Sequence, residues 1–355
     1  MDRTPRIAVV LAAGKGTRLK TELPKVLHKV AGKPMLQWVV EAARQAGCER
    51  VVVVTAPGDE RVRDALTENG RPPEWLDWVV QEERRGTGHA LLMAKPALAD
   101  TRARLLVLSG DAPLVTAETL EGILEASKSS WGAIAVSELD EPGNLGRVIA
   151  NREGSLARIV EAADAGLDEL AVKRVNSGVY VLPCPDIFDE LERLTPDNAQ
   201  GEIYLTDAPG AAAERGERVV LYSLEDVTEA WGVNTRAELA RAHRRLIDRH
   251  VERLLIDGVT LLEPERTVVE PTVTIGPDAV IHPDVTLLGD TQIGGRSVVH
   301  SGAWIRDSVV GRGVLVYPHS VLDGAKVDDW TSVGPFARLG SGPLLAADGE
   351  RREEL

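Results

Sequence analysis

The sequence predicts two folds in one chain: a Rossmann-like α/β domain with a mostly parallel sheet, followed by a short left-handed parallel β-helix. Three observations support this order. Apolar runs alternate with amphipathic stretches from Ile7 to about Val233, a polar arginine-rich segment follows, and beyond Thr260 aliphatic residues recur with a period of six. We expect an α/β domain over residues 1–233, a connecting helix over 234–259, a hexapeptide-repeat β-helix over 260–340 and a charged tail over 341–355.

The first part of the chain has the rhythm of an α/β domain. Continuous apolar runs predict strands at 7–11, 51–54, 105–108 and 134–136, and amphipathic stretches predict helices at 35–46 and 117–126. Such strands form a sheet covered on both faces, and ligands bind at its carboxyl edge. The glycine loop after Leu11 and the segment Ser109-Gly110-Asp111 both follow strands, so we expect them at that edge.

The loop after the first strand combines glycines with cations. Gly14 and Gly16 allow backbone amides to turn toward an anion, and Lys15, Arg18 and Lys25 concentrate positive charge around the same place. This pattern predicts a phosphate site, and a nucleotide is the first ligand to consider.

Two other interpretations of this loop fit the sequence less well. A P-loop would need a glycine at Val9 and a hydroxyl at Gly16, and neither is present. An ordinary strand-to-helix turn would explain the glycines but not the three cations.

Composition limits the function classes. The chain has 355 residues, 43% of them hydrophobic, and a formal net charge of −14, which argues against a nucleic-acid or anionic-membrane surface. The sequence has no apolar run near the roughly 20 residues that span a bilayer, so we expect neither an anchor nor a signal peptide. Cys48 and Cys184 are far apart and lack a C-x-x-C partner, which favours reduced thiols and the cytoplasm.

The second part of the chain changes period. A helix is expected over 235–256, with its arginines on a solvated face. The repeat then places aliphatic residues at Ile275, Ile281, Leu287, Ile293, Val299 and Ile305 and, after one step of four, at Val309, Leu315, Val321, Val327, Val333 and Leu339. At roughly 18 residues per turn this is a short stack, which needs capping or self-association. We expect a homo-oligomer, with a trimer favoured.

Several segments together resemble the bacterial bifunctional N-acetylglucosamine-1-phosphate uridyltransferase and glucosamine-1-phosphate acetyltransferase, the GlmU family. The resemblance covers residues 5 to about 340. The segments that carry it are 11–19, 23–28 with Gly32-Lys33-Pro34, Gln81 with Gly86-Thr87-Gly88-His89-Ala90, 110–114, 159–161, 175–178, 201–207 and Gly232-Val233-Asn234.

The resemblance implies transfer of UMP from UTP to N-acetylglucosamine-1-phosphate, with release of pyrophosphate and formation of UDP-N-acetylglucosamine for cell-wall synthesis. The attacking phosphate is already anionic, so the reaction needs positioning and charge neutralisation rather than a general base. For that reason His28 and His89 are expected to have structural roles. Arg18 and Lys25 would be the catalytic cations. Asp111 and Asn234 would share a Mg²⁺ ion.

The resemblance also implies which residues bind each substrate. Gln81 suits uracil because its amide offers both a donor and an acceptor. The expected nucleotide-binding residues are Leu11, Ala12, Ala13, Gly14, Lys25, Gln81, Gly86, Thr87, Ser109, Gly110 and Asp111. The expected sugar-binding residues are Gly146, Glu161, Asn176, Tyr204, Thr206 and Asn234.

The chain departs from the family pattern in two places. The family usually shows Gly-Tyr-Gly-Arg where this chain has Asn144-Leu145-Gly146-Arg147, which leaves sugar selectivity open. The family's acetyltransferase site is built on later coils of the β-helix, past the approach segment 336–339, so we expect no acetyltransferase activity from this sequence.

Three alternatives stay open at this stage. A related enzyme would transfer a nucleotide to glucose-1-phosphate or mannose-1-phosphate on the same scaffold. A non-catalytic relative would use the nucleotide pocket for regulation. An acyltransferase would work through the β-helix, with His282, His300 or His319 as a base.

Overall fold

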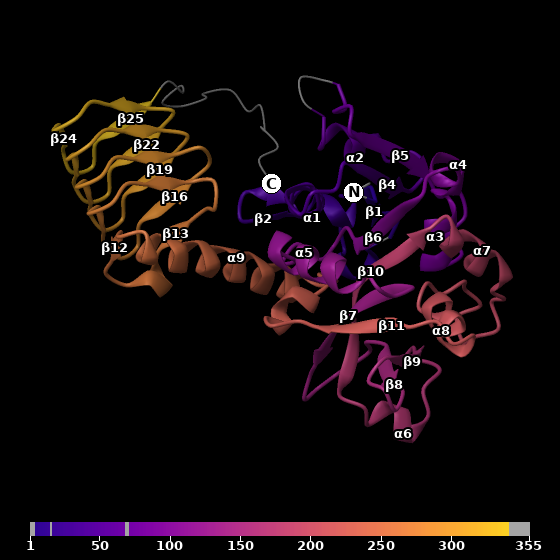
Figure 1. The fold of residues 1–355 in the computed structure, drawn as a ribbon. Coiled ribbons are helices and arrows are strands. Elements are labelled where there is room, and N and C mark those ends of the chain that lie inside the picture. Colours follow the sequence, from indigo (N-terminus) through magenta and orange to yellow (C-terminus); the bar gives the residue numbers. More distant parts are fainter. Residues whose placement is uncertain (1–3, 15, 68–70, 341–355) are drawn as a thin grey trace. The chain divides into compact units, whose positions relative to one another are not determined.

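A computed structural model describes residues 4–14, 16–67 and 71–340. Lys15 and the expected charged tail lie outside this part of the chain. The chain divides into two compact units, Met1–Ala242 and His243–Leu355. The boundary falls within the long helix α9 (Arg236–Ile256), which covers most of the expected connecting helix (Figure 1).

The first unit is built on a mostly parallel sheet, as predicted. The strand order is β11-β7-β10-β6-β1-β4-β5, and β10 runs antiparallel to both of its neighbours. The strands of this path are β1 (Arg6–Leu11), β4 (Arg50–Thr55), β5 (Leu76–Val80), β6 (Ala103–Ser109), β7 (Gly132–Glu138), β10 (Arg174–Cys184) and β11 (Val219–Ser223). Leu11 at the end of β1 pairs with Val54 on one side and with Ser109 on the other. The carboxyl ends of three strands therefore meet at one edge.

Helices cover both faces of this sheet because successive residues of each strand point to opposite faces. In β1, Ala8 and Val10 belong to one apolar core, whereas Ile7 and Val9 belong to the other. Helices α1 (Met35–Gln45) and α5 (Ala117–Ala126) contribute to the first core. The second core includes residues of α3 (Thr87–Leu92), α7 (Asp186–Arg193) and α8 (Asp207–Glu214).

Smaller elements extend the first unit. The hairpin of β8 (Arg147–Ala150) and β9 (Leu156–Val160) joins β10 through the pair Arg147 and Val175. The remaining elements are β2 (Lys29–Val30), β3 (Lys33–Pro34), α2 (Glu60–Asp64), α4 (Lys95–Leu98), α6 (Leu167–Leu170) and the short 3-10 helices η1 (Thr17–Leu19), η2 (Lys25–Leu27) and η3 (Val227–Ala230).

The second unit is the predicted β-helix, with three parallel sheets that stack coil upon coil (Figure 1). One sheet holds β12 (Thr260–Leu261), β15 (Val280–Ile281), β18 (Val298–Val299), β21 (Leu315–Val316) and β24 (Ser332–Val333). The second holds β13 (Val268–Val269), β16 (Thr286–Leu288), β19 (Trp304–Arg306), β22 (Val321–Asp323) and β25 (Arg338–Gly340). The third holds β14 (Thr274–Ile275), β17 (Gln292–Ile293), β20 (Val309–Val310) and β23 (Lys326–Val327), and η4 is Pro264–Arg266.

The predicted repeat positions are correct through Ile305 and are wrong by one residue over the next coil. Val310 pairs with Ile293 and is 2% exposed, whereas the predicted Val309 is 42% exposed. Val316 and Leu322 likewise replace the predicted Leu315 and Val321 as the buried positions. The step after Ile305 is thus five residues and not four. In each of these strands two aliphatic residues stand side by side, so hydrophobicity alone could not decide which one points inward.

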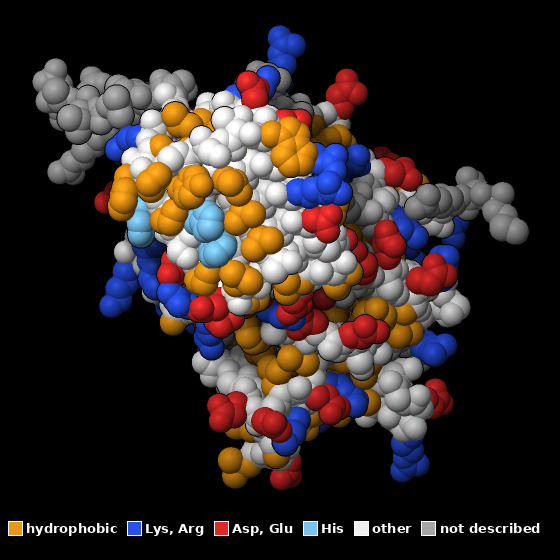
Figure 2. Space-filling model, turned by 90° about the vertical axis from the view of Figure 1, so that its left-hand side faces the viewer, with side chains coloured by type: hydrophobic (Ala, Val, Ile, Leu, Met, Phe, Trp, Pro, Cys, Tyr) orange, Lys and Arg blue, Asp and Glu red, His pale blue; other side chains and the backbone are white. Residues whose placement is uncertain are grey.

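The β-helix carries apolar side chains on its outside. Figure 2 shows hydrophobic and histidine side chains gathered on one face of the molecule. The ring centroids of His282 and His300 lie 4.5 Å apart, and those of His300 and Tyr317 lie 5.7 Å apart. Trp330 and Phe336 are 67% and 76% exposed. Within the described residues, none of the helices has the length and hydropathy needed to cross a membrane.

Candidate active site

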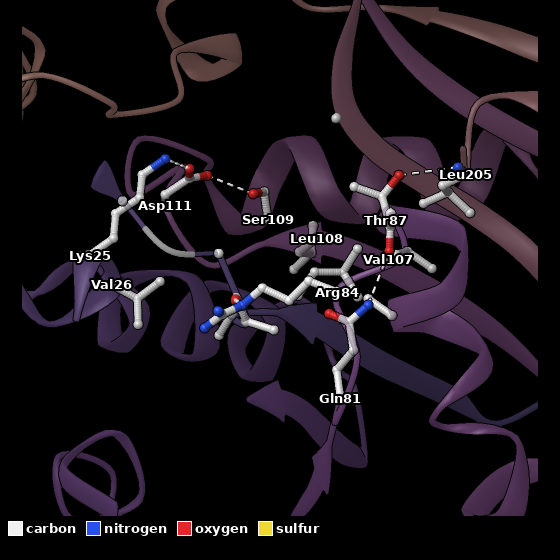
Figure 3. A pocket seen from close by; sticks show the side chains of 18 of the residues that line it. Lys25, Val26, Gln81, Arg84, Thr87, Val107, Leu108, Ser109, Asp111 and Leu205 are labelled. Carbon is white, nitrogen blue, oxygen red and sulfur yellow. Dashed lines mark hydrogen bonds and ion pairs between the residues drawn. The ribbon is translucent and has the colours of Figure 1, made fainter. Parts of the chain in front are cut away.

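A cavity of about 720 Å³ opens in the first unit, at the sheet edge where β1 and β6 end (Figure 3). The predicted site residues that line it are Leu11, Ala12, Ala13, Gly14, Arg18, Lys25, Gln81, Gly86, Thr87, Ser109, Asp111, Glu161, Asn176, Thr206 and Asn234. Three predicted residues, Gly110, Gly146 and Tyr204, are not part of the lining. Segments separated by more than 200 residues therefore meet around one space.

At one end of the cavity, cations meet oxygen ligands. The Lys25 ammonium contacts the Asp111 carboxylate and donates to Asn234 Oδ1 at 2.7 Å. Arg18 donates to the same Asn234 oxygen at 2.7 Å. Ser109 Oγ donates to the second oxygen of Asp111 at 2.5 Å, which orients the carboxylate (Figure 3). This end, formed by Arg18, Lys25, Ser109, Asp111 and Asn234, is called the phosphate end below.

The phosphate end suits a hard divalent cation. The oxygens of Asp111 and Asn234 both contact the Lys25 ammonium, so they converge on a point where positive charge is stabilised. No group of three or more histidine, cysteine, aspartate or glutamate side chains that could hold a metal was found in the described parts of the chain. A Mg²⁺ ion held here would have to complete its shell with water and substrate phosphates, which is how Mg²⁺ is commonly bound.

The opposite end is built by the segment after β5. Gly88 N donates to Ile203 O at 2.8 Å, and Ile203 N donates to Arg85 O at 2.8 Å. The Thr87 hydroxyl accepts the Leu205 N–H at 3.1 Å. Gly86 has φ +104°, and a Cβ there would lie 2.4 Å from Ile203 O, so this position requires glycine. This end, formed by Gln81, Gly86 and Thr87, is called the base end below.

Gln81 is oriented by two neighbours. Its side-chain nitrogen donates to Gly86 O at 3.2 Å and lies 3.1 Å from His89 Nδ1. The side chain is 3% exposed, and its carbonyl oxygen is left to accept from a ligand. Burial, followed by the charge of Arg85, lowers the pKa of His89 below its ordinary value of 6.5, so Nδ1 can accept from Gln81 at neutral pH. His89 therefore holds Gln81 in place.

His28 lies outside the cavity lining. Its side chain is 6% exposed, and Nε2 has no hydrogen-bond partner within the part of the chain that the structure describes. Burial, with a smaller contribution from the Arg236 charge, lowers its pKa.

The predicted sugar residues gather around Glu161. The Thr206 hydroxyl donates to Glu161 Oε1 at 3.0 Å, and a Cβ on Gly146 would lie 3.4 Å from both oxygens of that carboxylate. Asn176 N donates to Gly146 O at 2.9 Å, and Asn176 Nδ2 donates to the Tyr180 hydroxyl at 2.5 Å. An added Cβ at Gly146 would therefore be in ordinary contact with Glu161, and its nearest neighbour would be Ile159 Cγ2 at 3.2 Å.

Carboxyl groups lie close together in the region around Glu161, and the pKa values of Glu161 and Asp207 are raised. Burial is the main cause of a raised pKa for Glu161, and Asp164 adds to it. Burial, together with Glu161 and Asp164, raises the pKa of Asp207 to about 6. Tyr204 is buried, and burial raises the pKa of its hydroxyl to about 12. An uncharged, hydroxyl-rich ligand that donates hydrogen bonds would suit these carboxylates.

A second cavity of about 460 Å³ shares Arg18 and Asn234 with the first. Asn144 and Leu145, the residues that depart from the family pattern, line it together with Trp231. The departure therefore lies beside the phosphate end.

Sequence reasoning missed several lining residues, among them Arg84, Tyr180 and Glu202. Glu202 comes from the segment 201–207, which was expected to supply Tyr204 and Thr206, whereas Tyr180 lies two residues beyond the segment 175–178. Arg84 stands between Gln81 and Gly86 and could have been found as a cation within the predicted base segment. Its Nε donates to Ala13 O at 2.7 Å.

Comparison with known proteins agrees with this geometry. The MobA-like NTP transferase domain family matches residues 8–209. Among solved structures, UDP-glucose pyrophosphorylase in complex with UDP-glucose is similar in fold, with a TM-score of 0.58 and 22% identity, over 69% of this chain and 99% of that one.

Curated relatives are more similar in sequence. The bifunctional protein GlmU of Pelobacter propionicus is 40% identical over 95% of this chain and 73% of its own length. Those of Anaeromyxobacter dehalogenans and Streptococcus gordonii are 44% and 37% identical over 96% of this chain, and over 70% and 73% of their own lengths. The chain therefore belongs to the GlmU family, and it is a sugar-1-phosphate nucleotidyltransferase.

Proposed function

We propose that the chain transfers UMP from UTP to N-acetylglucosamine-1-phosphate and releases pyrophosphate, with Mg²⁺ bound at Asp111 and Asn234. The observation that carries this proposal is the phosphate end, where Lys25, Asp111 and Asn234 come from three distant segments and meet at one point inside the cavity. A pocket that only bound a nucleobase would have no need of this arrangement.

The chain's residues would act by placing the reactants and neutralising charge. An oxygen of the sugar phosphate attacks the α-phosphorus of UTP, the bond to the bridging oxygen breaks, and pyrophosphate leaves with that electron pair. No proton has to be removed, because the attacking phosphate is ionised at neutral pH. Lys25 and Arg18 lie where negative charge accumulates on the phosphates, which is commonly the largest catalytic effect.

Mg²⁺ would supply Lewis-acid polarisation of the phosphates at this point. Lys25 contacts both oxygen ligands, so it would exchange its contacts with Asp111 and Asn234 for contacts with phosphate when a metal binds. Ser109 donates to the other oxygen of Asp111, so it would keep the carboxylate oriented during this exchange.

At the other end, the Gln81 carbonyl oxygen would accept the N3–H of uracil. Cytosine has no proton on N3, so it could not donate in the same way. The sugar would lie by Glu161, Asn176 and Thr206, where Glu161 can accept hydrogen bonds from ring hydroxyls.

The deciding experiment is pyrophosphate release from UTP and Mg²⁺ with N-acetylglucosamine-1-phosphate, in parallel with glucosamine-1-phosphate, glucose-1-phosphate and mannose-1-phosphate. We expect turnover confined to the first sugar and lost in Asp111→Ala. Asp140→Ala is the matched control, because Asp140 lies outside the cavity lining and pairs with Lys173. Preference for another sugar would move the assignment to a sister enzyme, and nucleotide binding without turnover would support a regulatory relative.

We also propose that copies of the chain associate through the β-helix, as a trimer, and that the protein works in the cytoplasm. The exposed Trp330 and Phe336 support association, since exposed apolar patches commonly mark protein interfaces. Cys48 and Cys184, both buried and unpaired, suit a reducing compartment. Light scattering coupled to size-exclusion chromatography tests the trimer.

A further inference from the structure

We propose that Arg84 is a nucleotide-binding residue that holds the phosphates of the nucleoside triphosphate beyond the α-phosphate. This inference rests on the proposed nucleotidyltransferase function and assigns a role to a residue outside the predicted site.

Arg84 differs from the other two cations that line the described cavity. Lys25 contacts Asp111 and Asn234, and Arg18 donates to Asn234. Arg84 instead donates through Nε to a neutral carbonyl, that of Ala13. No ion pair of Arg84 occurs with any carboxylate in the described parts of the chain, so its charge is not compensated there.

The hydrogen bond from Arg84 Nε to Ala13 O also sets the direction of the guanidinium. With Nε committed to the carbonyl, the two Nη groups remain available, and the side chain is solvent-exposed. Figure 3 shows the side chain running past Gln81 toward the Lys25 side of the cavity. A planar guanidinium with two free NH₂ groups matches a phosphate in a forked, bidentate manner.

The location argues for a distal phosphate and not for the α-phosphate. The reacting phosphorus has to lie beside Asp111 and Asn234, because the oxygens of both residues converge there. In the described part of the chain, Arg84 forms neither an ion pair with Asp111 nor a hydrogen bond with Asn234. It is joined instead to Ala13, at the start of the glycine loop, where Gly14 has open space within 4 Å of an added Cβ. A chain of phosphates following that loop would pass the guanidinium.

The test measures binding of UMP, UDP and UTP to the full-length protein by isothermal titration calorimetry with Mg²⁺ present. We expect Arg84→Gln to weaken UTP binding by roughly ten- to a hundredfold, the range for a charge-assisted hydrogen bond, and UMP binding by less than about twofold. Arg84→Lys should lie between wild type and Arg84→Gln, since it keeps the charge but loses the fork.

Arg152→Gln is the matched control. It removes the same charge from an exposed position, and Arg152 does not line the cavity. We expect UTP binding unchanged within about twofold. Thermal melting of each variant establishes that it is folded.

Other results would overturn the inference while leaving the proposed function intact. If Arg84→Gln binds UTP as wild type does, the guanidinium holds no phosphate. If it weakens UMP and UTP equally, Arg84 acts only by fixing the loop at Ala13. A wild-type protein that prefers another nucleotide would contradict the uridine assignment, and the same series with that nucleotide would still test Arg84. Failure of the wild type to bind any triphosphate would overturn both.

Discussion

The two ends of the cavity are assembled in different ways. The phosphate end joins Lys25, Asp111 and Asn234 through contacts between charged and polar side chains. The residues of the base end come from one short segment, which backbone hydrogen bonds of Gly88 and Arg85 with Ile203 hold in place. A local segment can be recognised from its own sequence, whereas a meeting of distant side chains depends on the sheet that brings them together. The two ends should also fail differently when they are changed.

The largest effect is expected at the phosphate end. Lys25→Gln should reduce kcat by roughly a thousandfold, because it removes a cation from the point where charge develops. Steady-state rates of pyrophosphate release measure this. Lys33→Gln is the control, since Lys33 pairs with Glu41 and does not line the cavity. An unchanged kcat in folded Lys25→Gln would mean that the contact with Asp111 is only structural.

A change of backbone at the base end should instead cost stability. Gly86→Ala places a Cβ 2.4 Å from Ile203 O at φ +104°, so we expect a loss of about 1–3 kcal/mol in the free energy of unfolding. Denaturant unfolding followed by circular dichroism measures it. Gly210→Ala, in helix α8 with its nearest neighbour at 3.8 Å, should be neutral or stabilising by up to about 1 kcal/mol. Equal stability of the two variants would contradict the strained geometry of Gly86.

Loss of the Gln81 amide should affect UTP binding more than the chemical step. We expect Gln81→Ala to raise KM for UTP by about tenfold, the scale of one or two hydrogen bonds, with a smaller change in kcat. Initial rates over a range of UTP concentrations measure both constants. Gln37→Ala is the control, because Gln37 bonds to Glu41 away from the cavity. A drop in kcat with constant KM would assign Gln81 to the transition state and erase the difference between the ends.

The smallest effect concerns pH. Burial lowers the pKa of His89 below 6.5, so the ring is neutral at pH 7. When the pH falls below 6.5 and the ring becomes protonated, Nδ1 can no longer accept the hydrogen bond from Gln81. We expect UTP affinity to be constant from pH 8 to 7 and then to fall by about fivefold as His89 becomes charged.

Comparison with His89→Asn isolates this contribution, because an asparagine oxygen can accept from Gln81 at any pH. Affinities are measured by calorimetry at each pH, so that titration of UTP itself cancels between the two proteins. Identical pH profiles for both proteins would show that His89 does not control Gln81.

Most of the fold could be predicted from the sequence. The runs at 51–54 and 105–108 predict buried strands, and β4 and β6 contain them. The exception is the coil after Ile305, where Val309 and Val310 are equally apolar. Only the pairing of Val310 with Ile293 decides which of the two is buried.

The site was predicted in part, for the same physical reason. The segment from Gln81 to Gly86 can be recognised as a binding segment from its own sequence, since packing in an apolar core would not explain its glutamine and its glycine. Arg84, although within that segment, has an exposed, charged side chain of a kind common on any surface. Its importance depends on the position of Ala13, which no local pattern contains.

The sequence by itself determined the sheet, the helices that cover it, the repeating coils and the glycine loop, because alternation, period and glycine act over a few neighbouring residues. The tertiary structure alone decided that Asn234 meets Lys25 and Arg18, that Gly146 lies against Glu161, and that His89 lies within hydrogen-bond distance of Gln81. Such contacts depend on the direction in which each strand and loop delivers its side chains, and that direction is set by packing across the whole sheet.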